Sequence, residues 1–262
     1  MAADIHPNAQ LLQKIDHLYG LIGFPLSHSF SKKYFSRKFE EEGLNHHYYE
    51  LFPLEQIADF PALLQSFPNL QGLNVTIPYK QSVIPFLNEL NGEAKRVGAV
   101  NTIRIAGGRS IGFNTDIYGF EQSLRSFIAS EESSDIKALV FGTGGAAKAV
   151  WHVLEKMDIQ YQKVSREQSR ADLTYNTLDE PGIAEHRLLV NTTPLGMSPH
   201  TRSCPDIPYS GIGSGHYLYD LVYNPQKTLF LEKGEQRGAA IQNGLEMLFL
   251  QAERAWQIWN DG

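Results

Sequence analysis

Polar side chains that could bind a ligand or move a proton follow several predicted strands in the first half of the sequence. The segment 23–29, GFPLSHS, brings two hydroxyls and an imidazole, and the segment 72–80, GLNVTIPYK, ends on Lys80. Asn101 and Asp116 lie in two further short motifs, GAVNT and GFNTD. Ligands of open α/β sheets gather at the carboxyl ends of the strands, where we expect these groups to fall. The motifs thus add a lysine and a carboxylate, which are ionisable, to amides and hydroxyls.

A glycine-rich segment, GTGGAA at 142–147, stands directly between a predicted strand, 137–141, and a predicted helix, 146–157. It fits the G-x-G-x-x-G/A pattern of dinucleotide-binding loops, with Gly142 and Gly144 as its first two glycines. The free N–H groups and the positive dipole end of the helix would meet a pyrophosphate. A plain flexible turn is the alternative, but the strand before and the helix after favour a nucleotide. The candidate cofactor contacts of this loop are Gly142, Gly144, Gly145 and Ala146.

The second predicted strand of this half ends in Ser165 and Arg166, with Arg170 one turn later. Enzymes that use NAD typically place an acidic residue at this point, against the ribose hydroxyls. An arginine can instead bind a 2′-phosphate with its planar fork, which favours NADP. Glu167 would repel that phosphate if its side chain pointed inward, and a solvated surface arginine is the alternative reading of Arg166.

The composition is that of an ordinary globular protein. The 262 residues are 42% hydrophobic and 20% charged, and the formal net charge is −6, which argues against a nucleic acid or an anionic membrane as the main partner. No apolar stretch approaches the length of a membrane span, and the first residues lack the regions of a signal peptide. Cys204 is the single cysteine, so no internal disulfide can form. We therefore expect a cytoplasmic protein.

The order of the predicted elements indicates the α/β class with two domains. Strands and helices alternate in the first half, where the predicted strands are 17–23, 47–51, 72–77 and a hairpin over 100–115, and the helices are 31–43, 54–67 and 81–90. After a polar loop at 130–135, the predicted strands are 137–141, 162–165, 187–191, 217–222 and 239–242, and the helices are 146–157 and 245–259. We expect an N-terminal, mostly parallel open sheet for substrate and a Rossmann-like, doubly wound dinucleotide-binding domain.

The last predicted helix presents an apolar face, and we expect it to pack back on the first domain. The predicted domains are thus a discontinuous substrate domain, 1–116 plus 245–262, and a dinucleotide domain, 117–244.

Taken together and in order, these motifs resemble the shikimate dehydrogenase family. The resemblance runs from about Tyr19 to the C-terminus. Besides the segments above, it includes NTTPLGM at 191–197, DLVYNP at 220–225 and NGLEML at 243–248. It implies a reversible, NADPH-dependent reduction of 3-dehydroshikimate to shikimate in aromatic amino-acid biosynthesis, with NADP as cofactor, no metal, and a monomer or homodimer as the assembly.

The resemblance also implies roles for individual residues. Lys80 would be the acid/base, with Asp116 beside it. The ring carboxylate would be held by Ser27, Ser29, Thr76 and Tyr223, and the ring hydroxyls by Asn101, Asp116 and Gln251. The adenosine phosphate would be held by Ser165, Arg166 and Arg170, and the nicotinamide would lie near Met197 and Gly244.

Other readings of these residues stay open. The serines could simply cap the following helix, and Asn101, Gln251 and Tyr223 could be turn, surface and core residues. A relative that accepts quinate or NAD is the nearest alternative function, and a non-catalytic NADP sensor is an alternative of a different class. The chain departs from the common family pattern at Lys32, at Phe35 and Ser36, and at Glu167, the last of which bears on the cofactor.

Overall fold

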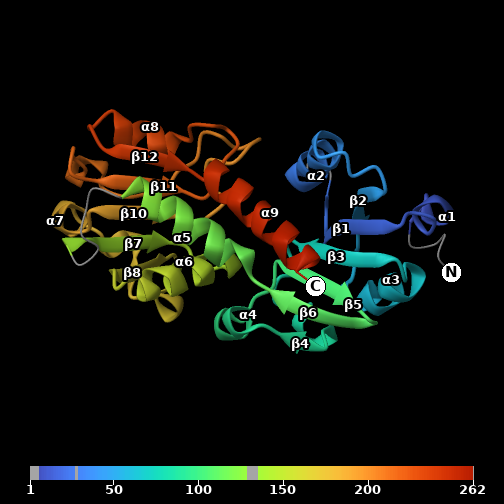
Figure 1. The fold of residues 1–262 in the computed structure, drawn as a ribbon. Coiled ribbons are helices and arrows are strands. Elements are labelled where there is room, and N and C mark those ends of the chain that lie inside the picture. The colour runs from blue at the N-terminus through green and yellow to red at the C-terminus, as the bar shows by residue number, and fades with distance from the viewer. Residues whose placement is uncertain (1–5, 27–28, 129–134, 262) are drawn as a thin grey trace. The chain divides into compact units, whose positions relative to one another are not determined.

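The computed structural model describes residues 6–26, 29–128 and 135–261. The chain forms two compact units, which Figure 1 draws as ribbons: unit 1 is Met1–Thr115 with Ala252–Gly262, and unit 2 is Asp116–Gln251. The assignment of substrate to the first and cofactor to the second stays a prediction at this point. Two expectations fall outside the described residues, namely the place of Ser27 and the loop over 130–134. No helix in the described ranges is long and apolar enough to cross a membrane.

Unit 1 is built on a mixed six-stranded sheet with the order β2-β1-β3-β5-β6-β4. Its strands are β1 (His17–Gly23), β2 (His47–Pro53), β3 (Leu70–Val75), β4 (Glu89–Leu90), β5 (Thr102–Ala106) and β6 (Arg109–Phe113). The β1–β2, β1–β3 and β4–β6 pairs are parallel, and β5 runs antiparallel to both of its neighbours. Gly107 and Gly108 turn the β5–β6 hairpin with φ of 56° and 73°, the left-handed backbone for which the dipeptide is suited. The predicted α/β class is confirmed, with one strand reversed in this sheet.

The helices of unit 1 differ from the prediction over 54–67 and 81–90, and two short helices at 9–12 and 92–97 were not predicted. The helices are α1 (Ala9–Leu12), α2 (Phe30–Glu41), α3 (Phe60–Ser66) and α4 (Gly92–Val97). The predicted helix over 81–90 is wrong: the segment forms turns, a 3₁₀ turn at Ile84–Phe86, and then β4. Pro85 lacks the N–H that an α-helix needs there, and its ring would clash with the preceding turn. The helix predicted from Leu54 begins only at Phe60, with Pro61 in the first turn, where proline is tolerated.

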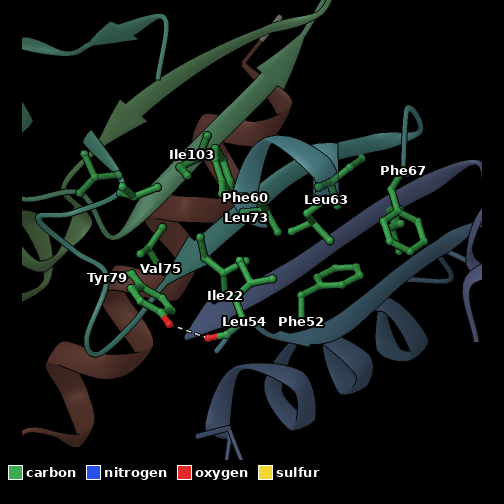
Figure 2. Close-up of a cluster of buried hydrophobic side chains, with 14 of the residues drawn as sticks. Ile22, Phe52, Leu54, Phe60, Leu63, Phe67, Leu73, Val75, Tyr79 and Ile103 are labelled. Carbon is green, nitrogen blue, oxygen red and sulfur yellow. Dashed lines mark hydrogen bonds between the residues drawn. The ribbon is translucent and has the colours of Figure 1, made fainter. Parts of the chain in front are cut away.

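One face of the unit 1 sheet packs a cluster of aliphatic and phenyl side chains. Ile22, Leu73, Val75 and Ile103 come from the strands and meet side chains of α3 and of the segments around it, as Figure 2 shows. Tyr79 belongs to this cluster, and its hydroxyl donates to the carbonyl oxygen of Leu54 at 2.6 Å. This bond satisfies the one polar atom that Tyr79 brings into the core.

The other face packs against residues from the far end of the chain. Ala252, Ala255 and Trp259 of α9 (Leu245–Asn260) join the buried rings of Tyr19 and Phe35. Gly72 makes room for this, since a Cβ at that position would lie 2.4 Å from the Trp259 ring. The Trp259 indole N–H in turn donates to the carbonyl of Ile103 at 3.0 Å.

Unit 2 is built on an all-parallel six-stranded sheet with the order β12-β11-β10-β7-β8-β9. Its strands are β7 (Lys137–Phe141), β8 (Gln160–Ser165), β9 (Leu173–Thr174), β10 (Leu188–Asn191), β11 (Tyr217–Asp220) and β12 (Ala240–Asn243). Numbered from β7, this is the order 3-2-1-4-5-6 of dinucleotide-binding folds. The predicted doubly wound sheet is confirmed.

Alternate residues of each strand point to opposite faces of the unit 2 sheet, and buried residues of both sets pack against helices. On one side, Leu218 fills the space above Gly234 of α8 (Leu229–Glu235). On the other, Tyr219 bonds Ser123 of α5 (Thr115–Phe127), and α6 (Gly145–Lys156) packs on β7 and β8. The remaining helix is α7 (Glu180–Glu185).

A stack of histidine and aromatic rings lies where β1 and β2 begin. The rings of His17 and His47 stack with centroids 4.4 Å apart, and His47 also meets Phe39 and Trp256. Burial lowers the pKa of His47, and the nearby charges of His17 and His46 lower it further.

Protonation of His47 should therefore destabilise unit 1. Its folded-state pKa lies below that of the unfolded chain, so the unfolded chain takes up the proton first as the pH falls through about 6.5. The contribution of His47 to the free energy of unfolding is therefore largest above that pH and decreases below it. The urea midpoint measured between about pH 7.5 and about pH 5.5 checks this.

His47→Phe keeps the ring and removes the titrating nitrogen, so the pH dependence of the midpoint should become weaker. The pKa of His6 is also lowered, chiefly by burial, and leaves a residual slope. His46→Gln is the matched control, since the His46 side chain is 77% exposed, and it should retain most of the dependence. An unchanged slope in His47→Phe would assign the effect to other groups.

Candidate active site

The glycine loop follows β7 at the point where the strand order of unit 2 reverses. Gly142 has φ of +106°, and a Cβ there would lie 2.7 Å from Oγ1 of Thr192, which follows β10. Both the left-handed backbone and the close approach therefore require glycine. Gly144 is the N-cap of α6, and a Cβ there would meet nothing within 4 Å. The loop thus leaves the N–H groups of the first turn of α6 open to an anion, as a pyrophosphate site needs.

The end of β8 presents the residues expected at the adenosine phosphate. Ser165 is the last residue of the strand, and its hydroxyl accepts from the backbone N–H of Glu167 at 3.3 Å. Arg166 and Arg170 are both exposed. The Glu167 carboxylate lies 3.2 Å from Nε of Arg170. The glutamate that departs from the common family pattern is therefore paired with one of the two arginines.

In unit 1, the carboxyl ends of β1 and β3 and the start of β5 bring three predicted site residues to one edge of the sheet. Thr76 follows β3, and its N–H donates to the carbonyl of Ile22 at 2.9 Å. The N–H of Val75, the residue before Thr76, donates to the carbonyl of Asn101 at 2.8 Å. The carbonyl of Lys80 accepts from the N–H of Val100 at 2.7 Å. Thr76, Asn101 and the lysine thus start from neighbouring backbone positions.

Ser29 is the N-cap of α2. Its hydroxyl accepts from the N–H of Lys32 at 3.4 Å. The hydroxyl thus makes the local bond that the sequence left open as an alternative. A capping serine retains its own O–H donor, so the bond is compatible with a role toward a carboxylate.

A chain of buried hydrogen bonds fixes Asn101. Its Oδ1 accepts the N–H of Thr115 at 2.7 Å, and its Nδ2 donates to Oγ1 of the same threonine at 3.0 Å. The hydroxyl of Thr102 donates to Oδ1 of Asn101 at 3.2 Å and accepts from Nδ2 of Asn74 at 3.3 Å. Oδ1 of Asn74 in turn accepts from the hydroxyl of Tyr49 at 2.8 Å. Asn101 is 3% exposed and Thr102 is fully buried. Hydrogen bonds to the N–H and hydroxyl of Thr115 and to the hydroxyl of Thr102 therefore fix the orientation of the Asn101 amide.

Asn74, Thr102 and Thr115 have no predicted role, although they lie in the motifs at 72–80, 98–102 and 112–116. One sequence feature does indicate a buried polar group here, because polar and apolar residues alternate along the strand at 73–76. It did not reveal which partners would satisfy them, because these come from β2, β5 and α5.

Two further predicted residues lie on helices that touch within unit 2. Asp116 is in the first turn of α5 and Gln251 is on α9; they are 7% and 9% exposed. The two helices meet at Gly119, where a Cβ would lie 2.6 Å from the carbonyl of Met247. Gln251 donates from Nε2 to the carbonyl of Leu248 at 2.9 Å.

The remaining predicted residues follow the unit 2 strands. Met197 is 46% exposed after β10, and Tyr223 is half-buried after β11, where burial raises the pKa of its hydroxyl. Gly244 follows β12, and a Cβ there would lie 2.1 Å from the carbonyl oxygen of Leu221. Only glycine fits this approach of backbone to backbone.

Comparison with known proteins connects both units to one family. Residues 21–103 match the family model described as the shikimate dehydrogenase substrate binding domain. The NADP(+) shikimate dehydrogenase of Carboxydothermus hydrogenoformans is 37% identical over 92% of this chain and 91% of its own length. The chain belongs to the shikimate dehydrogenase family.

Two solved structures of the family bear on substrate and cofactor. Shikimate 5-dehydrogenase from Thermus thermophilus, in complex with NADP(H) and shikimate, has a TM-score of 0.82 at 30% identity, over 93% of each chain. Quinate dehydrogenase from Corynebacterium glutamicum, in complex with NAD, has a TM-score of 0.83 at 26% identity, over 94% of each chain.

The buried chain around Asn101 gives a test of site geometry. Thr102→Val keeps the shape but removes a hydroxyl that joins Asn74 to Asn101, leaving buried polar atoms short of a partner. We expect a loss of about 1–3 kcal/mol of unfolding free energy and a raised KM for shikimate. Chemical denaturation and steady-state kinetics measure the two effects.

Thr102→Ser retains the hydroxyl and is the matched control, which should keep the wild-type KM. Should Thr102→Val lose stability while its KM equals that of Thr102→Ser, the hydrogen-bond chain serves folding alone.

Proposed function

We propose that this chain catalyses the reversible, NADPH-dependent reduction of 3-dehydroshikimate to shikimate, a step in aromatic amino-acid biosynthesis. The observation that carries this conclusion is the match over nine-tenths of the chain to NADP(+) shikimate dehydrogenases. The dinucleotide loop at the switch point of unit 2 supports it independently, since the geometry of Gly142 and Gly144 suits a bound pyrophosphate. NADPH supplies the hydride when bound.

The substrate residues proposed for unit 1 suit a small polar acid. Ser27, Ser29 and Thr76 would bind the ring carboxylate with hydroxyl donors, together with Tyr223. Asn101 would bind a ring hydroxyl, and its fixed amide orientation supports this because a rigid donor loses little entropy on binding. Asp116 and Gln251 would bind the other hydroxyls.

Lys80 is the proposed acid/base. When the C3 carbonyl of 3-dehydroshikimate is reduced, its oxygen gains a proton, and a group within hydrogen-bond reach has to supply it. The lysine ammonium can stabilise the developing alkoxide and then donate. Asp116 would orient the ammonium and a substrate hydroxyl.

The proposed cofactor residues of unit 2 are the glycine loop, including Gly145 and Ala146, and the group Ser165, Arg166 and Arg170 at the 2′-phosphate. Met197 and Gly244 would lie near the nicotinamide. We further expect a monomer or homodimer in the cytoplasm.

The deciding experiment adds shikimate and NADP to the purified protein and follows the absorbance of reduced cofactor. Steady formation of NADPH supports the proposal. Tight NADP binding without turnover would instead support the non-catalytic sensor.

Use of quinate or NAD is a second candidate, and the Glu167–Arg170 pair favours the use of NAD. The pair engages one of the two arginines proposed for the 2′-phosphate. Because both side chains are more than half exposed, the pair is weak and can open. Rates on shikimate and quinate, each measured with NADP and with NAD, separate the two candidates.

Replacing Lys80 tests the acid/base assignment. Positioned acid/base groups contribute roughly 10²–10⁴-fold, so Lys80→Met should lower kcat by about that factor while shikimate binding changes much less. Steady-state kinetics and calorimetry measure these quantities. Lys95→Met, at an exposed position of α4, is the matched control and should leave kcat unchanged. A folded Lys80→Met enzyme with near-normal kcat would remove lysine from the mechanism.

Replacing Arg166 tests the cofactor assignment. Arg166→Ala removes a charge-assisted contact to the 2′-phosphate, so the affinity for NADP should fall roughly 10- to 100-fold and the affinity for NAD should change little. Titration with each cofactor measures this. Arg237→Ala, an exposed arginine after α8, should alter neither affinity. Equal losses with NADP and NAD would indicate damage to the fold.

A further inference from the structure

Asp220 is a fully buried carboxylate at the end of β11 to which the proposed reaction gives no role. Its Oδ1 accepts from Nδ2 of Asn191 and from the N–H of Val222, both at 3.0 Å. Its Oδ2 accepts from the hydroxyl of Thr228 at 2.6 Å. One side chain thus bonds the end of β10, the start of the segment after β11, and the N-cap of α8.

Burial of the Asp220 carboxylate disfavours its charged form. Burial raises the pKa of Asp220 to about 6, against hydrogen bonds that lower it. Its hydrogen-bond donors are neutral groups, namely the Asn191 amide, the Val222 N–H and the Thr228 hydroxyl. The folded-state pKa of Asp220 lies above that of the unfolded chain. Its protonated form therefore favours folding at a pH below about 6, and its charged form lowers the free energy of unfolding at neutral pH. Its three hydrogen bonds, rather than its charge, are what the side chain contributes to the fold.

What Asp220 does supply is a fixed orientation for Asn191. With its Nδ2 bonded to the carboxylate, the asparagine points Oδ1 at Thr193, accepting from its N–H at 3.1 Å and its hydroxyl at 2.7 Å. The Thr193 hydroxyl oxygen accepts from the N–H of Leu195 at 3.3 Å. The bonds continue from the carboxylate along the segment 192–197, which leads to Met197.

The same segment forms the wall against which the glycine loop is placed. A Cβ on Gly142 would lie 2.7 Å from Oγ1 of Thr192 and 3.0 Å from Cγ2 of Thr193. Gly196, with φ of +85°, lies close to Thr228, whose Cβ would be 3.2 Å from an added Cβ. A displacement of the segment 192–197 would therefore shift both the glycine loop proposed for the pyrophosphate and Met197, which is proposed to lie near the nicotinamide.

We propose that Asp220 is a positioning residue for the cofactor: by orienting Asn191, Val222 and Thr228 it sets the segment 192–197 in the geometry that receives the nicotinamide half of NADP. This inference rests on the proposed function. It makes the hydrogen-bond acceptors of Asp220, rather than its charge, the quantity that matters.

The test compares two substitutions of the full-length enzyme with a control on the same strand. Asp220→Ala removes both acceptors, so NADP affinity should fall roughly 10- to 100-fold and kcat should fall as well, while the KM for shikimate changes less than about threefold. Asp220→Asn keeps the Oδ1 acceptor and removes the charge. It should bind NADP within a few-fold of wild type and melt at the same or a higher temperature at neutral pH.

Leu218→Ala is the control for loss of stability, because Leu218 is fully buried on β11 and belongs to the hydrophobic core. It should lower the melting temperature and leave NADP affinity unchanged. Asn191→Ala should reproduce part of the loss in Asp220→Ala, and the double variant should bind NADP no more weakly than Asp220→Ala, since Asn191 acts through Asp220.

Hydrogen exchange of the cofactor-free protein separates this inference from the proposed function. Asp220→Ala should accelerate exchange of the Thr193 and Leu195 amides, and Leu218→Ala should not do so selectively. A wild-type protein without shikimate turnover would sink the proposed function, and the exchange result would still decide whether Asp220 orders the segment. Wild-type NADP affinity in Asp220→Ala, or equal losses in Asp220→Ala and Asp220→Asn, would overturn the inference.

Discussion

A polar side chain that is buried at the end of a strand has to find hydrogen-bond partners, and both units of this enzyme are organised by that constraint. At the sheet edge of unit 1, the amides of Asn74 and Asn101 are satisfied by hydroxyls from other elements. In unit 2, Asn191 and Asp220 satisfy each other. The partners available are the backbone and side chains that follow neighbouring strands. Satisfying the buried groups therefore fixes the segments on which binding residues stand.

The constraint also separates two kinds of polar residue at the same sheet edges. Asn191, Asp220 and Thr228 are buried and bonded to one another, whereas Arg166 and Arg170 are exposed. The first kind is rigid before any ligand arrives, and the second can adapt to a ligand at low cost. A cofactor bound as proposed would meet a preorganised surface at its nicotinamide half and movable charges at its adenosine half.

Much of the fold could be predicted from the sequence because its signals are local. The glycine loop between a strand and a helix, the Gly107-Gly108 hairpin and the apolar runs of unit 2 depend only on neighbouring residues. The helix predicted over 81–90 does not form, because Pro85 lacks the N–H that the helix would need there. The reversal of β5 follows from the tight turn that joins it to β6 and from the pairing of β5 with β3.

The candidate site divides in the same way. The residue types and their places after strands could be predicted, and the family resemblance supplied roles. The pairing of Glu167 with Arg170, the orientation of Asn101 and the relay from Asp220 could not, since each depends on side chains brought together by tertiary packing. Asp220 stood in a quoted motif, but sequence alone does not tell a buried acceptor from a solvated acid.

The packing of Trp259 against Gly72 has a consequence for folding during translation. The core of unit 1 includes Ala252, Ala255 and Trp259, which follow the whole of unit 2 in the chain. On the ribosome, the first 115 residues emerge early but lack the side chains that close one face of their sheet. Unit 2 is continuous, and its hydrophobic core is complete before those side chains emerge. Unit 1 is therefore translated first, but its hydrophobic core is completed only after that of unit 2.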